Sequence, residues 1–417
     1  MGQNRPYEEE FFNETRENVD KFKFTPISIF EYNKIVRSLN SNKPLGPSTI
    51  PAWAIKDCLN TVAEPLTYLI NAFLEEGRFP NHLKSAHVVP IYKNGDTEEP
   101  NNYRPISITS ALSKIFEKVI RNQMVEYLEK YNIISPIQFG FRAKFSTTDA
   151  LLYATENIRS DIDNNKMVAA AFLDLSKAFD SISHEILLKK LAEYRFHDTA
   201  IAMIKSYLTN RTQKVFLQNT ASDWINLYQG VPQGTILGPL LFNLYVNSMQ
   251  KVIDNTCKIV QYADDIFIFV ADKCLNTAKQ NLETNIAKLA EYFESHRLNL
   301  NENKSEFILF CKKSQNKLTQ NLKLQVKNHS TNISSFVKYL GVYLDQNLTY
   351  EREVKNVLKK MACGIKTMYA VKQFLPEKTC LLLLNALVIS HLHYPSILLQ
   401  GLSQNLVTTL EKQLSWA

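Results

Sequence analysis

The stretch from Lys258 to Val270, KIVQYADDIFIFV, constrains the fold of this chain more than any other. Two apolar runs flank the adjacent acids Asp264 and Asp265, and the second run is apolar at every position from Ile266 onward. Such a run is typical of a strand that is buried on both faces of a sheet. Carboxylates placed between buried strands are costly unless cations meet them. The pair therefore lies either in a solvated hairpin turn or at a site that binds positive charge.

A third acid follows another apolar run. The segment from Met167 to Leu173, MVAAAFL, predicts a buried strand that ends at Asp174. A sheet that pairs this strand with the hairpin would bring three carboxylates to one edge, where they cannot all ionise without cations. Hard divalent cations, Mg²⁺ above all, prefer such oxygen ligands. Two such ions about 4 Å apart can activate an attacking oxygen and stabilise a leaving phosphate.

The charge distribution favours a polyanionic partner. The hydrophobic content of 45% and the charged content of 21% are ordinary for a globular protein. The formal net charge is +7, but residues 1–20 hold six acids against two bases, a net of −4, so the remainder carries about +11.

The six cysteines contain no CxxC pair, which argues against a disulfide framework and a zinc site and favours a reducing compartment. The most apolar run, 381–390, is too short to span a bilayer. No signal peptide opens the chain. We therefore predict an intracellular protein, in the nucleus or the cytoplasm, without a membrane partner; the sequence does not indicate an oligomeric state.

The apolar periodicity predicts helices and strands along most of the chain. Segments 27–39 and 53–76 have helical spacing, and the second is expected to break near Pro65. The segment 85–110 is typical of a hairpin with a long tip, and an amphipathic helix is expected over 111–131. Further helices are predicted over 150–164, 183–194, 199–208, 237–249 and 273–296, and from 350 onward. Further strands are predicted over 214–217, paired with 224–228, and over 307–310, 322–326 and 336–344.

Six segments, in order, resemble the successive motifs of reverse transcriptases. FLDLSKAFDSISH (172–184), GVPQGTILGPLLFNLYVNSM (230–249) and QYADDIFIF (261–269) resemble three motifs of the reverse transcriptase palm. The flanking segments VVPIYKNGDTEEPNNYRPISI, LNLNENKSEFILF and VKYLGVYLD match as well. Together they resemble the polymerase of non-LTR (LINE-type) retrotransposons, nearest the jockey-like group, over residues 35–417.

This resemblance implies an α+β fold, the right-hand polymerase with fingers, a palm built on an antiparallel sheet, and a helical thumb. The implied domains are an N-terminal helical extension (1–84), fingers (85–165), a palm (166–345, with a fingers insertion around 200–230) and a thumb (346–417) that looks truncated. The implied activity is that of an RNA-directed DNA polymerase, a nucleotidyltransferase. It extends a DNA primer 3′-OH with dNTPs along an RNA template, using two Mg²⁺ ions, for which Mn²⁺ is a possible substitute.

The resemblance also assigns the metal site and the sugar gate. Asp174, Asp264 and Asp265 match the metal-binding carboxylates, and Leu175 stands where the family offers a backbone carbonyl to one ion. Phe179 matches the aromatic gate that leaves no room for a 2′-OH, the alternative being a plain core residue.

The remaining assignments concern substrate and primer. Lys93 and Arg104 match triphosphate clamps, although charged hairpin edges are often only solvated. Gln233 and Gly234 match the loop beside the templating base, where glycine permits close backbone approach. Lys304 matches a lysine proposed to protonate the leaving pyrophosphate, the alternative being a surface lysine. The primer grip is matched by three consecutive residues, Tyr339, Leu340 and Gly341.

Two alternatives to a competent polymerase remain. Family polyproteins carry an endonuclease upstream and often further segments downstream, so the chain is expected to be a fragment. It could then be a truncated, inactive remnant that only binds nucleic acid. A viral RNA-dependent RNA polymerase is disfavoured by Phe179 and the YADD turn, because those enzymes typically have a polar gate and a GDD turn.

Overall fold

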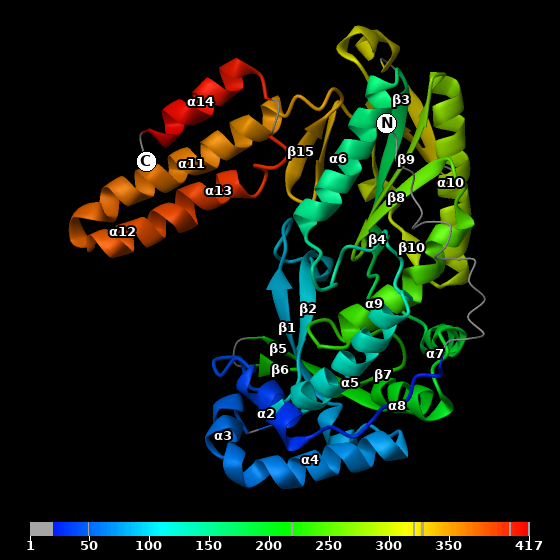
Figure 1. Cartoon of the computed structure of the whole chain (residues 1–417), viewed down its shortest axis with the longest axis vertical. Coiled ribbons are helices and arrows are strands. Elements are labelled where there is room, and N and C mark those ends of the chain that lie inside the picture. Colours follow the sequence, from blue (N-terminus) through cyan, green and yellow to red (C-terminus); the bar gives the residue numbers. More distant parts are fainter. Residues whose placement is uncertain are drawn as a thin grey trace. The chain divides into compact units, whose positions relative to one another are not determined.

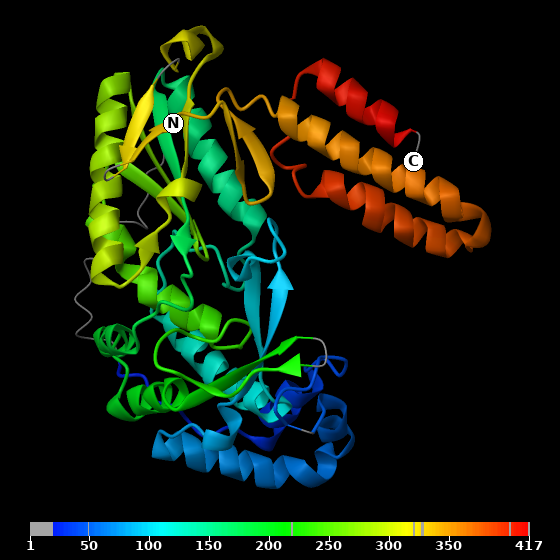
Figure 2. The ribbon, with the colours of Figure 1, turned by 180° about the vertical axis from the view of Figure 1, so that it is seen from behind.

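The computed structural model describes residues 20–48, 50–217, 220–319, 322–326, 329–399 and 402–415. Most of the acidic N-terminal stretch, residues 1–19, lies outside the described residues. The chain divides into two compact units (Figures 1 and 2). Unit 1 comprises 1–136, 176–249 and 293–299; unit 2 comprises 137–175, 250–292 and 300–417. Both units mix helices and strands, which confirms the mixed class predicted from the sequence.

The first three helices in the described part of unit 1 are α2 (Ile29–Arg37), α3 (Ala52–Asp57) and α4 (Leu59–Glu76). A capping box starts α2, because Ser28 Oγ accepts from Glu31 N and the Glu31 carboxylate accepts from Ser28 N. The break predicted near Pro65 is wrong. The helices separate at Cys58, and Pro65 lies inside α4. Proline removes only one hydrogen bond from the helix, and the buried apolar face of α4 continues on both sides of it.

The sheet of unit 1 is built on the predicted hairpin. Strands β1 (Ala86–Tyr92) and β2 (Tyr103–Ile108) pair antiparallel. Strand β5 (Arg211–Leu217) adds parallel to β1 and pairs antiparallel with β7 (Ile225–Leu227), which confirms the second predicted pair. The remaining elements of unit 1 are β6 (Thr220–Ala221), α5 (Ala111–Lys130), α7 (His184–Glu193), α8 (Asp198–Leu208) and α9 (Gly238–Val246).

A four-stranded antiparallel sheet forms the centre of unit 2, in the order β11-β3-β9-β8. Its strands are β3 (Met167–Leu173), β8 (Cys257–Tyr262), β9 (Asp265–Asp272) and β11 (Glu306–Phe310). Figures 1 and 2 show α6 (Thr147–Asp163) and α10 (Leu275–Ser295) on opposite sides of this sheet. Burial on both faces explains why the strand sequences are apolar without alternation.

Two hairpins follow in unit 2, β12 (Lys323–Val326) with β13 (His329–Asn332) and β14 (Phe336–Tyr339) with β15 (Val342–Asp345). The strand segment predicted over 336–344 is thus two strands, because Leu340 and Gly341 adopt positive φ angles of 44° and 87° and reverse the chain. Two short strands, β4 (Leu175–Ser176) and β10 (Asn299–Leu300), complete the list of strands in the described part.

The chain after residue 350 is helical, as predicted. Its helices are α11 (Glu351–Val371), α12 (Glu377–Leu384), α13 (Ser390–His393) and α14 (Gln404–Leu414), which lie together in Figure 1. They share an apolar core of their own that includes Val357, Met361 and Val388. Tyr343 N donates to the Glu353 carboxylate at 2.9 Å and so joins α11 to β15.

All six cysteines are free thiols. Within the described residues, no helix is both long enough and apolar enough to cross a membrane.

Candidate active site

The three predicted metal-binding acids lie at one end of the unit 2 sheet. Strand β3 ends at Leu173, which pairs with Ile266 of β9, so Asp174 and Asp265 follow at the same end of neighbouring strands. Because side chains alternate along a strand, both acids belong to the face that carries Phe172 and Phe267. These two rings are paired in the register and stacked at 4.3 Å.

Asp264 lies in the tight turn between β8 and β9. Tyr262 pairs with Asp265, so the turn consists of Ala263 and Asp264 alone. Ala263 has a positive φ of 58°. Its N–H donates to Gln138 Oε1 at 3.3 Å, and its carbonyl accepts from Gln261 Nε2 at 2.9 Å. The two buried glutamines thus fix both backbone groups of the residue before Asp264.

The segment 137–140 supports this turn from beside β8. Phe139 N donates to Gln261 O at 2.8 Å, and Gln261 N donates to Ile137 O at 2.9 Å, as in a strand pair. Gly140 N donates to Gln138 Oε1 at 2.7 Å. A Cβ at Gly140 would overlap the backbone nitrogen of Ala263. The sequence analysis predicted no strand for this segment; the signal that the sequence offered was glutamine and glycine inside an apolar run.

Asp174 is held by a residue that the sequence analysis did not single out. Asn301 Nδ2 donates to Asp174 Oδ2 at 3.2 Å, and Asn301 N donates to Asp174 O at 2.8 Å. The carbonyl of Asn301 accepts from Lys304 N at 3.2 Å. Lys304 is exposed and belongs to the same short turn as Asn301. One asparagine therefore connects the predicted metal ligand to the predicted proton donor.

The predicted primer grip is the turn of the β14–β15 hairpin. Tyr339 packs its ring against Phe172 at 5.1 Å and Phe267 at 5.2 Å, on the face that carries the acids. Burial, together with the nearby Asp265 carboxylate, raises the pKa of Tyr339 well above its ordinary value. Leu340 O accepts a hydrogen bond from the Tyr394 hydroxyl. The predicted grip turn thus contacts the sheet that carries the three acids and the C-terminal helical segment, all within unit 2.

In unit 1, Gln233 and Phe179 are brought together by Asp180. Gln233 Nε2 donates to the two carboxylate oxygens of Asp180 at 3.3 and 3.2 Å. Val231 N donates to Phe179 O at 2.9 Å, and the Phe179 ring stacks on Phe242 at 4.7 Å. The predicted gate residue Phe179 and the loop residue Gln233 are therefore joined by hydrogen bonds through Asp180 and Val231.

Gly234 brings this loop against β2. Ser107 N donates to Gln233 O at 2.7 Å. Gly234 has a φ of 94°, and a Cβ there would meet Ile106 Cγ2 at 3.0 Å and Ser107 O at 3.1 Å. Both the backbone conformation and the available space thus require glycine, as the sequence analysis expected for a close backbone approach.

Two titratable side chains hold the start of the same loop. His184 Nε2 lies 2.8 Å from Gly230 O, which fixes its proton on Nε2 as the donor. Burial lowers the pKa of His184, and the bond to Gly230 opposes that shift only in part. Burial raises the pKa of Asp180, while the hydrogen bond from Gln233 opposes the shift.

Lys93 and Arg104 lie near the tip of the β1–β2 hairpin, and both are exposed. Lys93 directly follows β1, and its N–H donates to Asn102 O at 2.8 Å. Arg104 pairs with Ile91, two residues before Lys93. Because side chains alternate along a strand, the side chains of Lys93 and Arg104 belong to the same face of the hairpin.

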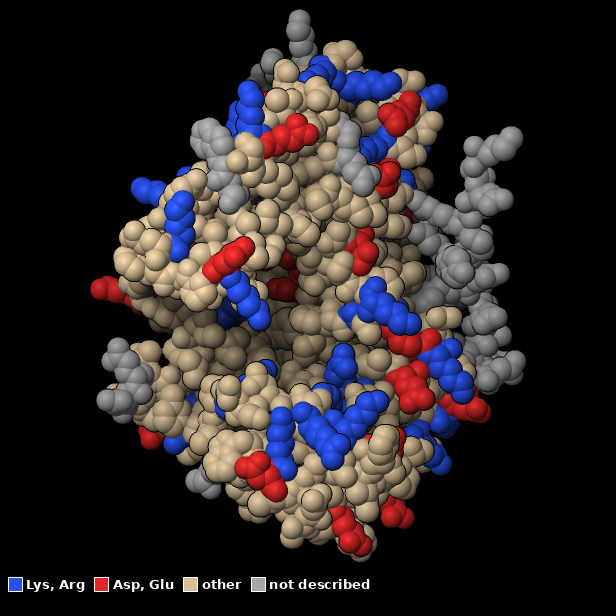
Figure 3. All heavy atoms as spheres, turned by 60° about the vertical axis from the view of Figure 1, so that its left-hand side comes forward, with Lys and Arg blue, Asp and Glu red and all other residues tan. Residues whose placement is uncertain are grey.

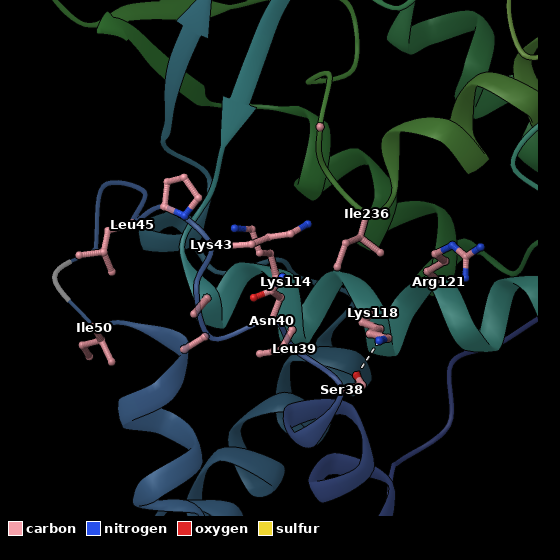
Figure 4. Close-up of a pocket in the computed structure, with 14 residues that line it drawn as sticks. Ser38, Leu39, Asn40, Lys43, Leu45, Ile50, Lys114, Lys118, Arg121 and Ile236 are labelled. Carbon is pink, nitrogen blue, oxygen red and sulfur yellow. Dashed lines mark hydrogen bonds between the residues drawn. The ribbon is translucent and has the colours of Figure 1, made fainter. Parts of the chain in front are cut away.

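Unit 1 also contains a basic pocket of 350 Å³. Its cationic lining residues are Lys43, Lys114, Lys118 and Arg121. Figure 4 shows the last three on successive turns of α5, with Ile236 opposite and Lys118 Nζ donating to Ser38 Oγ at 2.6 Å. Among the described residues, no Asp or Glu lines the pocket. Lys and Arg also gather on the lower part of the surface in Figure 3, where α2 to α5 lie.

Positive neighbours act on two of these lysines. Burial is the largest cause that lowers the pKa of Lys114, and the charge of Lys43 is the next. Burial is likewise the largest cause that lowers the pKa of Lys118, and the charge of Arg121 is the next. The pocket therefore has an excess of positive charge that an anion would neutralise.

The donor chemistry of the sheet edge fits Mg²⁺, since all three side chains offer hard oxygen ligands. The described residues contain no preformed group of three His, Cys, Asp or Glu side chains that could hold a metal ion. Mg²⁺ is usually bound by one or two carboxylates together with substrate phosphates, rather than by a cage made of protein alone.

The family model described as reverse transcriptase (RNA-dependent DNA polymerase) matches residues 91–344. The chain belongs to this family. It is 30% identical over 342 residues to the probable RNA-directed DNA polymerase from transposon BS of Drosophila melanogaster, covering 80% of this chain and 37% of that protein. It is 27% identical over 349 residues to the RNA-directed DNA polymerase from mobile element jockey of the same species, covering 82% of this chain and 38% of that protein.

The chain thus spans less than two fifths of the length of these relatives. A solved structure of apo telomerase from Candida tropicalis, truncated from its C-terminal domain, aligns with a TM-score of 0.43 at 13% identity. That alignment covers 63% of this chain and 54% of that one. The predicted likeness to non-LTR retrotransposon polymerases is confirmed by the sequence relatives.

Proposed function

We propose that this chain is the RNA-directed DNA polymerase of a non-LTR retrotransposon. It extends a DNA primer 3′-OH with dNTPs along an RNA template by phosphoryl transfer. The observation that carries the proposal is the position of Asp174 and Asp265 at one end and on one face of a buried sheet, beside the held Asp264 turn. This arrangement occurs within the segment that matches the reverse transcriptase family.

The domain organisation that goes with this function is the right hand. The extension covers 1–84, the fingers 85–165, the palm 166–345 with the fingers insertion around 200–230, and the thumb 346–417. The β1–β2 hairpin is evidence for the fingers assignment and the four-stranded antiparallel sheet for the palm assignment. The helices from α11 onward are evidence for the thumb assignment.

The roles of the acidic edge are those that the family resemblance implies. Asp174 and Asp264 would be the principal ligands of two Mg²⁺ ions, with Asp265 and the Leu175 carbonyl as further ligands. When bound, the ions supply charge stabilisation for the attacking and leaving oxygens. The chain itself orients Asp174 through Asn301 and fixes Asp264 through Gln138 and Gln261. Catalysis then depends on positioning and electrostatics, as in other phosphoryl transfers.

The other residues would handle the nucleotide and the primer. Lys93 and Arg104 bind the triphosphate from one face of the hairpin, and Lys304 gives a proton to the leaving pyrophosphate. The ring of Phe179, held on Phe242, excludes a 2′-OH, while Gln233 and Gly234 lie against the templating pair. Tyr339, Leu340 and Gly341 grip the primer end.

The basic pocket and the basic helices serve nucleic-acid binding in this proposal. The cations on α5 form a row without acidic neighbours in the described lining, which suits the phosphates of an RNA strand. The free cysteines and the lack of a membrane-spanning helix in the described part support an intracellular site of action, in the nucleus or the cytoplasm.

Primer extension on poly(rA)/oligo(dT) with Mg²⁺ tests the proposal. We expect extension by the full chain and a loss of at least about a hundredfold in Asp264→Asn, because one metal-binding charge is removed. The matched control is Asp272→Asn at the far end of β9, the strand that follows the Asp264 turn, and it should keep the activity. RNA binding without any extension would instead support the inactive remnant, and extension by Asp264→Asn would refute the metal assignment.

A further inference from the structure

Glu117 of α5 is completely buried, with an exposed fraction of 0%. Its carboxylate accepts from Ser113 Oγ at 3.1 Å and from the Tyr207 hydroxyl at 3.3 Å. It also accepts from the backbone N–H groups of Ile236 at 2.9 Å and Leu237 at 3.2 Å. All these groups belong to unit 1. A buried carboxylate of this kind has no role in the chemistry described above.

Arg211 of β5 accompanies Glu117 in the interior. Its side chain is 1% exposed, and its guanidinium lies over the Tyr207 ring at 4.7 Å. Arg211 Nη1 donates to Tyr207 O at 3.1 Å, whereas Nε and Nη2 have no hydrogen-bond partner among the described residues. Burial raises the pKa of Glu117, and the charge of Arg211 is the largest opposing influence.

The two backbone N–H groups that donate to Glu117 lie where the 233–237 loop leads into α9. Leu237 is the N-cap residue of this helix, and no side chain of the cap itself satisfies the helix start. The Glu117 carboxylate of α5, distant in sequence, therefore accepts hydrogen bonds at the start of α9 as an N-cap side chain would. It lies at the positive end of the helix dipole.

The other end of this loop carries Gln233. Its carbonyl accepts from Ser107 N at 2.7 Å, and its side chain donates to Asp180. With Glu117 at 236–237, the loop is fixed at both ends, and the position of Gln233 depends on both. Gly234 and Thr235 lie between the two anchors.

We propose that Glu117 is a positioning residue of the nucleotide site, whose carboxylate anchors the 233–237 loop and thereby places Gln233 for binding of the incoming dNTP. The inference rests on the proposed polymerase function. Stability alone does not explain the arrangement, because buried groups of opposite charge are commonly replaceable by apolar side chains of similar volume without loss. What apolar side chains cannot supply is an acceptor for the two N–H groups.

Two double variants separate the acceptor from the charge. Glu117→Gln with Arg211→Met removes both charges but keeps an amide oxygen for the N–H groups of Ile236 and Leu237. Glu117→Met with Arg211→Met removes the charges and the acceptor at nearly the same volume. The full chain carrying each pair is compared in steady-state extension of poly(rA)/oligo(dT) with dTTP, together with its thermal unfolding midpoint.

We expect the KM for dTTP to be about fivefold to thirtyfold higher in the methionine pair than in the glutamine pair, the effect of one or two lost hydrogen bonds. The kcat values should remain close, because the metal-binding edge is unchanged. Equal KM values in the two pairs would overturn the inference. If the wild-type chain itself does not extend primers, it is the proposed function that fails.

Glu117→Asp provides a second measurement if the methionine pair does not fold. The shorter side chain keeps the charge opposite Arg211 but withdraws the carboxylate from the loop. A raised KM for dTTP at unchanged kcat is expected. A KM equal to that of the wild type would show that the contacts to the loop do not position Gln233.

Discussion

The turn that carries Asp264 and the loop that carries Gln233 are both held in place, but by different kinds of groups. In unit 2, amide side chains and backbone hold Ala263, through Gln138 and Gln261. In unit 1, ionisable side chains hold the loop, through Asp180, His184 and the buried Glu117. The two side chains that hold Ala263 are neutral amides, whereas those that hold the loop are charged or titratable.

This difference follows from what each region is proposed to do. A charged anchor beside Asp264 would shift its pKa and compete with metal ions for the carboxylate. Neutral amides fix the backbone without that competition. The loop proposed to lie beside the nucleotide base has no proposed metal ligand, so ionisable anchors are tolerated there, and their burial shifts pKa values instead. The geometry of the turn should therefore be insensitive to pH, whereas that of the loop should depend on it.

The largest effect is expected from Gly140→Ala. The new Cβ overlaps the backbone nitrogen of Ala263, so the turn must move and take Asp264 with it. A displacement of about 1 Å at a reacting centre can lower a rate by about a hundredfold. We expect a loss of that size in kcat for primer extension, and a loss of about 1–3 kcal/mol in the free energy of unfolding measured in urea.

Gly77→Ala is the matched control for this variant. Gly77 ends α4 with a φ of 65°, and a Cβ there would meet Thr199 O at 2.6 Å. The substitution should destabilise the chain to a similar degree, but the kcat of the folded protein should not change. Equal losses of kcat in the two variants would mean that Gly140 acts only through stability.

The sheet of unit 2 was largely predictable from the sequence, whereas the supports of the site were not. Apolar runs such as 167–173 and 266–270 carry their own signal, because strands buried on both faces need them. Motif resemblance located Asp174, Asp264 and Asp265, and the register places the two strand ends together. Their catalytic role remains a prediction.

Several of the supporting residues lie far from the site in sequence. Asn301 is 127 residues from Asp174, and Glu117 is 119 residues from Ile236. A single asparagine or glutamate within an ordinary helix or turn belongs to no periodic pattern, so the sequence does not predict which residue it will bond. The same limit explains the error at Pro65, because a local rule predicted a break that the buried face of α4 overrides.

A smaller effect is expected from the pH dependence of the loop. Burial lowers the pKa of His184, so the neutral form is favoured in the folded chain. Its contribution to stability is present above the unfolded pKa of about 6.5 and is lost as the pH falls through and below that value. One such group changes the free energy of unfolding by at most about 1.4 kcal/mol per pH unit. Urea unfolding between pH 5 and pH 8 measures this slope.

His184→Gln is the variant that isolates this group. The glutamine amide can still donate to Gly230 O but does not titrate near neutrality. Asp180 has a raised pKa, so its contribution to stability is lost as the pH rises through the folded pKa, the opposite direction to His184. Both the wild type and the variant contain Asp180, so its contribution cancels in the comparison. The wild type should therefore lose more stability than the variant below pH 6.5. Parallel curves would show that His184 is not held neutral.

The smallest effect is expected from Ala263→Gly in the turn itself. Ala263 has a φ of 58°, a conformation that costs a residue with a Cβ about 1 kcal/mol and glycine very little. Glycine also gains freedom in the unfolded chain, which offsets about 0.4–1 kcal/mol of that relief. The free energy of unfolding should thus change by less than about 1 kcal/mol, and primer extension should be retained because Gln138 and Gln261 bond only to the backbone. A clear loss of extension would mean that the Ala263 methyl group, which is buried, helps to aim Asp264, and that amide anchors alone do not fix the turn.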